Sequence, residues 1–188
     1  PNPFWFSCAS ALANDLVANF KDPSGGFFDT RSDQPELLLR PKNLQDNATP
    51  SGNALAALAL LHLHAYSGET RWYDLAMHSL KITQASASEY PTAFAQWLSA
   101  FDYTQGPSTE VAILLIPGDS QPSPFLNVLW SQYRPRLVAA IASPPASPGS
   151  PALLHNRELV NGQPAAYVCR HNVCQFPVTT TDELIKLL

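Results

Sequence analysis

Apolar residues recur at intervals of three and four along the first hundred positions, which is the period of helices that bury one side. Short loops are expected to make consecutive helices antiparallel, as in helical hairpins. The pattern predicts four helices, over residues 4–20, 50–66, 69–86 and 91–103.

The second predicted helix is unusual because alanine and leucine fill nearly all its positions from Ala54 to Leu61. A helix that is apolar on every side is normally buried on most of them. Thr49 is expected to cap it, with Pro50 in the first turn, where the missing N–H costs nothing. We therefore expect this to be the inner, buried helix of a hairpin.

Between the first two helices the sequence predicts a turn and a short hairpin. Pro23 disfavours helix at the residue before it, and Gly25-Gly26 tolerates positive φ, so the first helix should end here. Residues 25–30 are predicted to form a strand arm, with residues 37–40 as its partner.

In the second half of the chain the pattern changes from helix to strand. Residues 110–116 and 137–141 are continuous runs of β-branched residues, leucine and alanine, as in buried strands. A short helix over 124–132 lies between them, which predicts a βαβ unit. Short strands over 165–170 and 173–176 and a terminal helix from Asp182 complete the prediction.

These elements predict an α+β protein that is mainly helical. Residues 1–106 are assigned to helical hairpins, and residues 107–188 to a smaller α/β subdomain. The proline-rich segment over 144–151 is predicted to be a mobile linker in the second part.

Composition narrows the classes of partner and compartment. The chain has 188 residues, is 45% hydrophobic and only 14% charged, and carries a net charge of −4. Nucleic acid and anionic membranes are not expected as partners because there is no basic patch. No apolar run reaches the roughly 18 residues of a membrane span, and no signal peptide is evident. Three cysteines, an odd and low number, fit a reducing compartment, so a cytoplasmic protein is predicted.

Several ordered motifs carry a family resemblance. They are Gly25-Gly26-Phe27-Phe28-Asp29-Thr30, Arg40-Pro41-Lys42, Asp46-Asn47-Ala48-Thr49-Pro50-Ser51-Gly52-Asn53, Tyr133-Arg134-Pro135, Ala166-Tyr167-Val168-Cys169-Arg170 and Cys174-Gln175. Together these motifs span nearly the whole chain, and they resemble the C-terminal region of thioredoxin-domain-containing proteins related to spermatogenesis-associated protein 20.

The resemblance implies an architecture larger than this chain. Members of the family have an N-terminal thioredoxin-like domain and an (α/α)6 toroid similar to six-hairpin glycosidases and N-acylglucosamine 2-epimerases. On this resemblance the chain is a partial toroid of helical hairpins, followed by a C-terminal α/β appendage. Its expected partner is the rest of the same protein, and self-association over the missing interface is the alternative.

A polar loop over residues 40–53 precedes the alanine-leucine helix and holds the first candidate site. Arg40, Lys42 and Asn53 are candidates for a rim that binds a sugar or a carboxylate. Asp46 is the candidate general acid or base, with Asp29 as the only nearby second carboxylate, because glycosidases use such pairs. The structural alternative is that Asp46 satisfies loop N–H groups and that Arg40 pairs with it.

Three histidines form a second group. His62 and His64 are two residues apart and so lie on different faces of their helix, which excludes a metal pair there. His78 on the next helix is placed to approach one of them. Related epimerases use histidines as acid and base, so the resemblance implies that role as one alternative to histidines satisfied in the core or on the surface.

Cys169 and Cys174 form the third candidate site. A two-residue turn at His171-Asn172 puts the two cysteines opposite each other, with Cα atoms ~4.5 Å apart. Disulfides tolerate such a separation. Three alternatives stay open: a redox-active disulfide, a zinc site with His171 that lacks a fourth ligand, or two free thiols in a reducing compartment.

Two functions follow from this sequence, and enzyme activity is left open between them. In the first, the chain belongs to a thioredoxin-linked protein that binds or processes a small carbohydrate-like ligand. In the second, it is a non-catalytic scaffold or protein-interaction module that supports a thioredoxin-like domain. No phosphate loop, serine nucleophile elbow or metalloprotease helix is present, and no cofactor or metal is expected.

Overall fold

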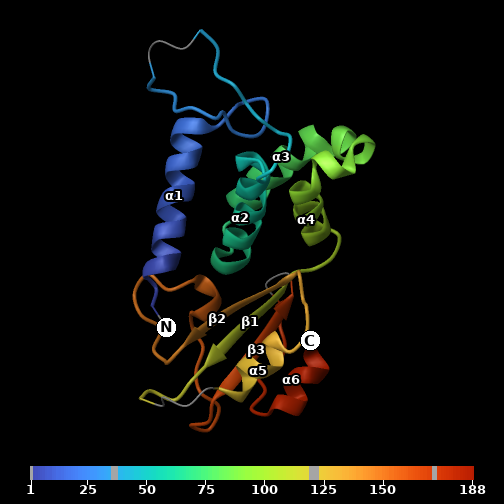
Figure 1. The fold of residues 1–188 in the computed structure, drawn as a ribbon. Coiled ribbons are helices and arrows are strands. Elements are labelled where there is room, and N and C mark those ends of the chain that lie inside the picture. The colour runs from blue at the N-terminus through green and yellow to red at the C-terminus, as the bar shows by residue number, and fades with distance from the viewer. Residues whose placement is uncertain (1, 35–37, 119–122, 171–172) are drawn as a thin grey trace. The chain divides into compact units, whose positions relative to one another are not determined.

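The structure is a computed structural model that describes residues 2–34, 38–118, 123–170 and 173–188. The chain divides into two compact units (Figure 1). A helical unit contains residues 8–64 and 69–105, and a sheet unit contains residues 1–7, 65–68 and 106–188. Helices and a mixed sheet together make an α+β fold, as predicted. The (α/α)6 toroid and the partition into domains 1–106 and 107–188 stay predictions.

Four α-helices make up most of the first half of the chain. Their positions follow the predicted ones to within a few residues, and α1 matches its predicted range. They are α1 (Phe4–Phe20), α2 (Gly52–Ser67), α3 (Thr70–Glu89) and α4 (Ala95–Thr104), with a 3-10 turn, η1 (Pro91–Ala93), before α4. No helix within the described ranges is long and apolar enough to cross a membrane.

Helix α3 shows why this pattern folds as a helix. Its buried residues recur at intervals of three and four, so they form one stripe along the helix. They are Trp72, Ala76, Ser79, Leu80, Thr83 and Ala87. The hydroxyl of Thr83 donates to the carbonyls of Ser79 and Leu80, so the buried polar group is satisfied within its own helix.

The start of α2 differs from the prediction. The helix begins at Gly52, and Ser51 caps it, because the Ser51 hydroxyl accepts a hydrogen bond from the Ala54 N–H at 3.1 Å. Thr49 and Pro50 lie before the helix and are exposed. Burial is also less complete than expected, since Leu55 is 49% exposed while Leu60 and Leu61 are buried.

The predicted strand over residues 25–30 is wrong. The segment forms turns, and only Phe27 pairs in a β-bridge, with Lys21. Of its predicted partner arm over 37–40, residue 37 lies outside the described residues and the others form no strand. The glycine pair explains the outcome, because φ is +110° at Gly25 and +73° at Gly26, which turns the chain back on itself.

The second unit is built on a four-stranded mixed sheet. Its spatial order is β2-β1-β3-β4, in which β2 runs parallel to β1 while β3 is antiparallel to both β1 and β4. The parallel pair and the helix between its strands confirm the predicted βαβ unit. The strands are β1 (Thr109–Leu114), β2 (Leu137–Ala142), β3 (Ala165–Arg170) and β4 (Val173–Cys174).

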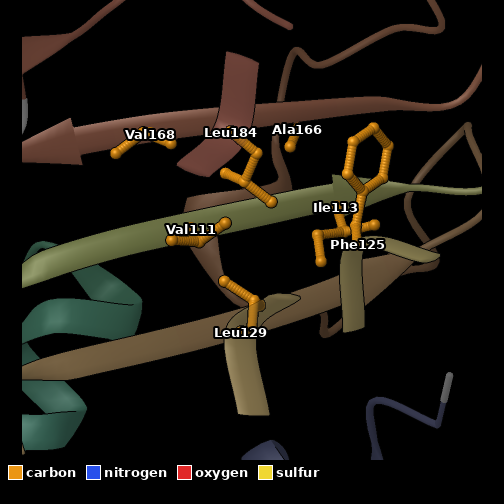
Figure 2. Close-up of a cluster of buried hydrophobic side chains, with 7 residues drawn as sticks. All are labelled: Val111, Ile113, Phe125, Leu129, Ala166, Val168 and Leu184. Carbon is orange, nitrogen blue, oxygen red and sulfur yellow. The ribbon is translucent and has the colours of Figure 1, made fainter. Parts of the chain in front are cut away.

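Two short helices, α5 (Pro124–Trp130) and α6 (Thr181–Leu187), cover one face of this sheet (Figure 1). Figure 2 shows the apolar cluster that these helices form with the sheet, to which alternate residues of β1 and β3 contribute. Its members are Val111, Ile113, Phe125, Leu129, Ala166, Val168 and Leu184. Thr180 caps α6, because its hydroxyl accepts a hydrogen bond from the Glu183 N–H and donates one to the Glu183 carboxylate.

The opposite face of the sheet carries the remaining residues of β1 and β3. A 3-10 turn, η2 (Ala152–Leu154), buries Leu153 and Leu154 and contacts β1 and β2 on this side. The proline-rich segment over 144–151 leads into η2 and contains a cis bond between Pro144 and Pro145. Because both lie within one compact unit, the segment joins parts of that unit.

Candidate functional site

The polar loop of the helical unit is organised around Asp46. Its Oδ1 accepts a hydrogen bond from the Ser51 N–H, and its Oδ2 accepts one from the Gln96 N–H, both at 2.8 Å. Its own N–H donates to the Ala93 carbonyl at 2.8 Å. Ser51 precedes α2 and Gln96 lies in the first turn of α4, so one carboxylate satisfies free N–H groups at the start of two helices.

Asn53 is the most deeply buried of the candidates in this loop. Its Oδ1 accepts from the Phe27 N–H at 2.7 Å, and its Nδ2 donates to the carbonyls of Phe27 and Asn43. Phe27 thereby gains the pair of bonds that a neighbouring strand would have supplied. Gly26 makes room for this contact, because a Cβ at that position would lie 2.8 Å from the Asn53 Oδ1.

The two basic candidates also bind the chain itself. Arg40 donates to the carbonyls of Asn19 and Thr30, and its guanidinium lies 4.2 Å from the centre of the Phe28 ring. The expected pairing of Arg40 with Asp46 is therefore not formed. Its Nε, a buried atom, has no partner within the described residues.

Lys42 makes the one ion pair of this loop among the described residues. Its Nζ lies 2.7 Å from the Asp22 carboxylate and donates to the Gly25 carbonyl at 2.8 Å. The hydrogen bond from Lys42 and a second from the Ser24 N–H lower the pKa of Asp22 from its ordinary 3.8 to about 2. Lys42 therefore holds the turn over 22–26 closed.

Asp29, the second candidate carboxylate, is exposed. Both its oxygens accept from the Asn43 N–H at 3.1 Å. Asp29 and Asp46 thus bind different parts of the backbone, and neither bonds to the other. In this structure Asp46 satisfies loop N–H groups, as in one half of the structural alternative, while the pairing of Arg40 with Asp46 in that alternative is not formed.

His62 and His64 have different neighbours. The His62 ring packs edge-on against Tyr103 at 5.0 Å, and burial lowers the pKa of its imidazole below the ordinary 6.5. The His64 ring lies 5.4 Å from that of Tyr73, and its Nδ1 is 3.2 Å from the Glu69 carbonyl. No group of three His, Cys, Asp or Glu side chains that would hold a metal ion is found among the residues that the structure describes.

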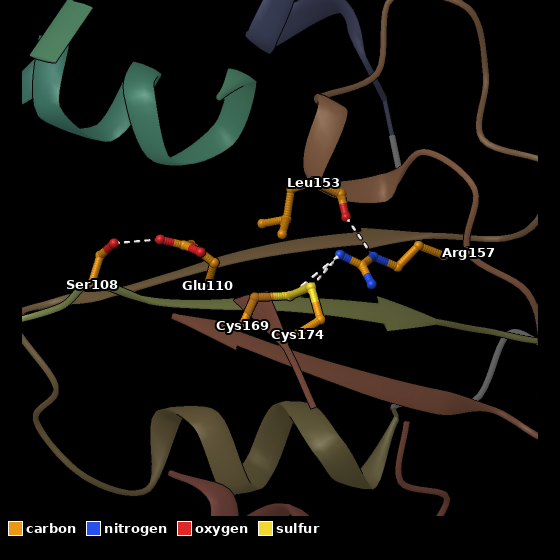
Figure 3. The surroundings of a disulfide bond; sticks show 6 residues. All are labelled: Ser108, Glu110, Leu153, Arg157, Cys169 and Cys174. Carbon is orange, nitrogen blue, oxygen red and sulfur yellow. Dashed lines mark hydrogen bonds between the residues drawn. A yellow bond between two sulfur atoms is a disulfide. The ribbon is translucent and has the colours of Figure 1, made fainter. Parts of the chain in front are cut away.

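In the sheet unit, Cys169 and Cys174 stand opposite each other on β3 and β4, as the sequence predicted, and a disulfide joins them (Figure 3). Their Cα atoms are 3.9 Å apart, and they form the non-hydrogen-bonded pair of the hairpin. The free-thiol alternative is wrong in this structure. The zinc alternative is also wrong, because disulfide sulfurs are not thiolate ligands; its third ligand, His171, lies outside the described residues.

Arg157 completes this site, and it was not among the residues predicted from the sequence. Its Nη2 donates to both sulfurs, at 3.1 Å from Cys174 and 3.3 Å from Cys169. Its Nε binds the Leu153 carbonyl at 3.0 Å, and its guanidinium lies 4.7 Å from the centre of the Tyr167 ring. Asn156 before it has φ of +54°, a left-handed conformation that asparagine tolerates, and this turn follows η2 directly.

Glu110 lies on β1 beside Cys169. It is the register partner of Cys169 across β1 and β3, so the two side chains share one face of the sheet. Glu110 is only 5% exposed, and its carboxylate accepts a hydrogen bond from the Ser108 hydroxyl (Figure 3). Arg157 contacts both sulfurs, and Glu110 lies on the same face of the sheet with its carboxylate directed toward Ser108 (Figure 3).

Comparison with known proteins gives one kind of relative. The chain is 27% identical over 194 residues to spermatogenesis-associated protein 20 of Mus musculus, 29% identical over 197 residues to that of Homo sapiens, and 30% identical over 194 residues to that of Rattus norvegicus. Each alignment covers 98% of this chain. No protein-family model matches the chain.

These alignments establish homology to spermatogenesis-associated protein 20 over nearly the whole chain. The chain spans about a quarter of the length of these relatives, 24% in each case. The homology therefore concerns one region of a longer protein, and it assigns no reaction to the residues described above.

Proposed function

We propose that this chain is a non-catalytic structural module of a longer protein, homologous to one region of spermatogenesis-associated protein 20. In that protein its helices continue an (α/α)6 toroid and support a thioredoxin-like domain. The observation that carries the proposal is the apolar surface of α1. Of the 17 residues in this helix only Ala13 is buried, while Trp5 is 72% exposed and Leu12 is 71% exposed.

An exposed apolar helix surface of this kind marks a contact with further protein. Burying a side chain such as Leu12 contributes roughly 1.5–3 kcal/mol to the stability of the contact that covers it. This favours a permanent contact within one polypeptide. The low charge of the chain, 14%, agrees with a surface that is partly covered. The occupant we propose is a helical segment from the part of the longer protein that corresponds to the unmatched three quarters of its relatives.

The polar loop supports a structural role over a catalytic one. An acid–base carboxylate needs an oxygen that reaches the substrate. Both oxygens of Asp46 instead bind backbone N–H groups that begin α2 and α4. Both oxygens of Asp46 hold the starts of α2 and α4 in place, which favours a structural role for this carboxylate.

Chemical labelling tests the proposal. Leu12→Cys is made with Cys8→Ser, and its reaction rate with a maleimide is measured in this chain and in the longer natural protein. We expect labelling to be at least about tenfold slower in the longer protein, because the contact must open before the thiol reacts. Ala85→Cys, at an exposed position of α3, is the control and should react at one rate in both.

Two results contradict the proposal. Equal rates for Leu12→Cys in both proteins would show that nothing covers α1. Slow labelling in this chain alone, together with a dimeric mass in solution, would instead assign the surface to a second copy. In parallel, a thermal shift of the longer protein with a sugar, abolished by Asp46→Asn, would favour carbohydrate binding.

A further inference from the structure

The two sulfurs of the cross-strand disulfide differ in accessibility. Cys169 on β3 is 1% exposed, whereas Cys174 on β4 is exposed to solvent. Thiol–disulfide exchange requires an incoming thiolate to reach one sulfur while the other leaves. In this hairpin Cys174 is open to attack, and Cys169 is the sulfur that leaves.

The leaving sulfur has a cation beside it. Arg157 is half-buried and donates to both sulfurs, and burial lowers the pKa of its guanidinium. Among the described residues no carboxylate forms an ion pair with Arg157. A thiolate formed at this position would supply the missing opposite charge, and such contacts favour the ionised form of a cysteine.

Burial makes the two reduced cysteines unequal. Cys169 is 1% exposed, and its register partner on β1, Glu110, is buried on the same face of the sheet. Removal from water disfavours the charged form of a thiol. Cys174 is exposed to solvent, and its Sγ lies 3.1 Å from the Arg157 Nη2, so the thiolate of the reduced pair is favoured on Cys174. The ring of Tyr167 lies against the guanidinium, with its centre 4.7 Å from it.

We propose that Cys169, Cys174 and Arg157 form a reversible thiol–disulfide exchange centre that reacts with dithiols. A thiolate of the dithiol attacks the Cys174 Sγ, and Cys169 leaves as a thiolate beside Arg157 and takes a proton. The second thiol of the dithiol, once deprotonated, attacks the dithiol sulfur of the mixed disulfide and releases the Cys174 thiolate. The dithiol is oxidised to its disulfide, and the protein gains two electrons. This centre does not depend on the structural role proposed above.

The first test measures the equilibrium of the whole chain with reduced and oxidised dithiothreitol and with glutathione. The native protein should be substantially reduced in a glutathione buffer that leaves structural disulfides oxidised. Arg157→Met should shift the equilibrium constant about tenfold toward the disulfide, or about 30 mV for this two-electron couple. The absorbance of the thiolate should report a Cys174 pKa raised by about one unit in the same variant.

Two further variants separate chemistry from folding. Arg157→Lys keeps the charge and should restore most of the shift, even if the lost Leu153 contact lowers the melting temperature. Arg170→Met is the matched control, because Arg170 lies on the same hairpin and binds the Leu187 carbonyl instead of the sulfurs. It should leave the equilibrium unchanged.

The order of attack is tested on single cysteines. With Cys169→Ser, the remaining Cys174 should react with glutathione disulfide at least about tenfold faster than Cys169 does in Cys174→Ser. A native disulfide that stays oxidised in the glutathione buffer would overturn the proposal. An equilibrium that Arg157→Met and Arg170→Met shift equally would also overturn it, as would equal rates for the two single cysteines.

Discussion

The polar loop of the helical unit and the disulfide site of the sheet unit both gather polar side chains, but these side chains bind different partners. In the loop, Asp46 and Asn53 bind backbone groups, so their polar atoms hold turns and begin helices. In the hairpin, Arg157 binds two sulfurs, one of which is exposed. Density of polar residues in the sequence therefore does not separate a functional site from a structural one.

What separates them is whether the polar groups have partners in the chain. A backbone N–H that is buried without a partner costs about 1–3 kcal/mol, so a loop lined by free N–H groups needs carboxylates and amides to fold. The loop over 40–53 meets that need with Asp46 and Asn53. Sulfur is a weak acceptor, so the contacts of Arg157 with the disulfide satisfy the guanidinium less well and leave a cation available.

The largest effect is expected from Asn53→Ala. This change removes three hydrogen bonds and leaves the N–H and C=O of Phe27 without partners in a buried place. We expect the free energy of unfolding to fall by about 3 kcal/mol, measured by denaturant titration with tryptophan fluorescence. Asn14→Ala, which removes one exposed bond on α1, is the control and should cost under about 0.5 kcal/mol. A loss no larger than the control's would contradict the contrast between the loop and the disulfide site, because the loop would then not need its polar residues to fold.

Much of the fold was predictable because periodicity reports burial directly. Helix α1 and strand β3 have the residue ranges that their patterns predicted, and the βαβ unit follows from two apolar runs with a helix between them. The errors lie where partners distant in sequence decide the structure. Residues 25–30 resemble a strand by composition, but Phe27 takes its hydrogen bonds from Asn53, which is 26 positions away.

The sites show the same limit. The pairing of Cys169 with Cys174 was predictable because only two residues separate the two strands, which limits the possible register. The contact of Arg157 with the sulfurs was not predictable, because Arg157 precedes Cys169 by 12 positions. It reaches the sulfurs only because η2 and the turn at Asn156 fold over the sheet. Register across β1 and β3 brings Glu110 to Cys169, and no pattern in the sequence specifies that pair.

An intermediate effect is expected from Asp46→Asn. The amide retains one oxygen, so it accepts from only one of the Ser51 and Gln96 N–H groups, and it loses the charge that favours two helix N-termini. We expect the free energy of unfolding to fall by about 1 kcal/mol. Asp29→Asn, at an exposed carboxylate bound only to the Asn43 N–H, should cost under about 0.5 kcal/mol. Equal stability of Asp46→Asn and the native chain would free this carboxylate for acid–base chemistry and remove the contrast with the hairpin.

The smallest effect is expected from Asp22→Asn, and it concerns how stability depends on pH. Lys42 lowers the pKa of Asp22 to about 2, below the ordinary 3.8 that the carboxyl recovers on unfolding. A lowered pKa stabilises the folded state above the unfolded value, so this contribution is complete above about pH 4 and disappears as the pH falls through about 2. The slope of unfolding free energy against pH between 4 and 2 should therefore be shallower in Asp22→Asn than in the native chain. Asp74→Asn, an exposed residue of α3, is the control and should keep the native slope. If Asp22→Asn also keeps it, Lys42 and Asp22 do not stabilise the turn, and the loop's ionic contact would be as dispensable to folding as an ordinary surface pair.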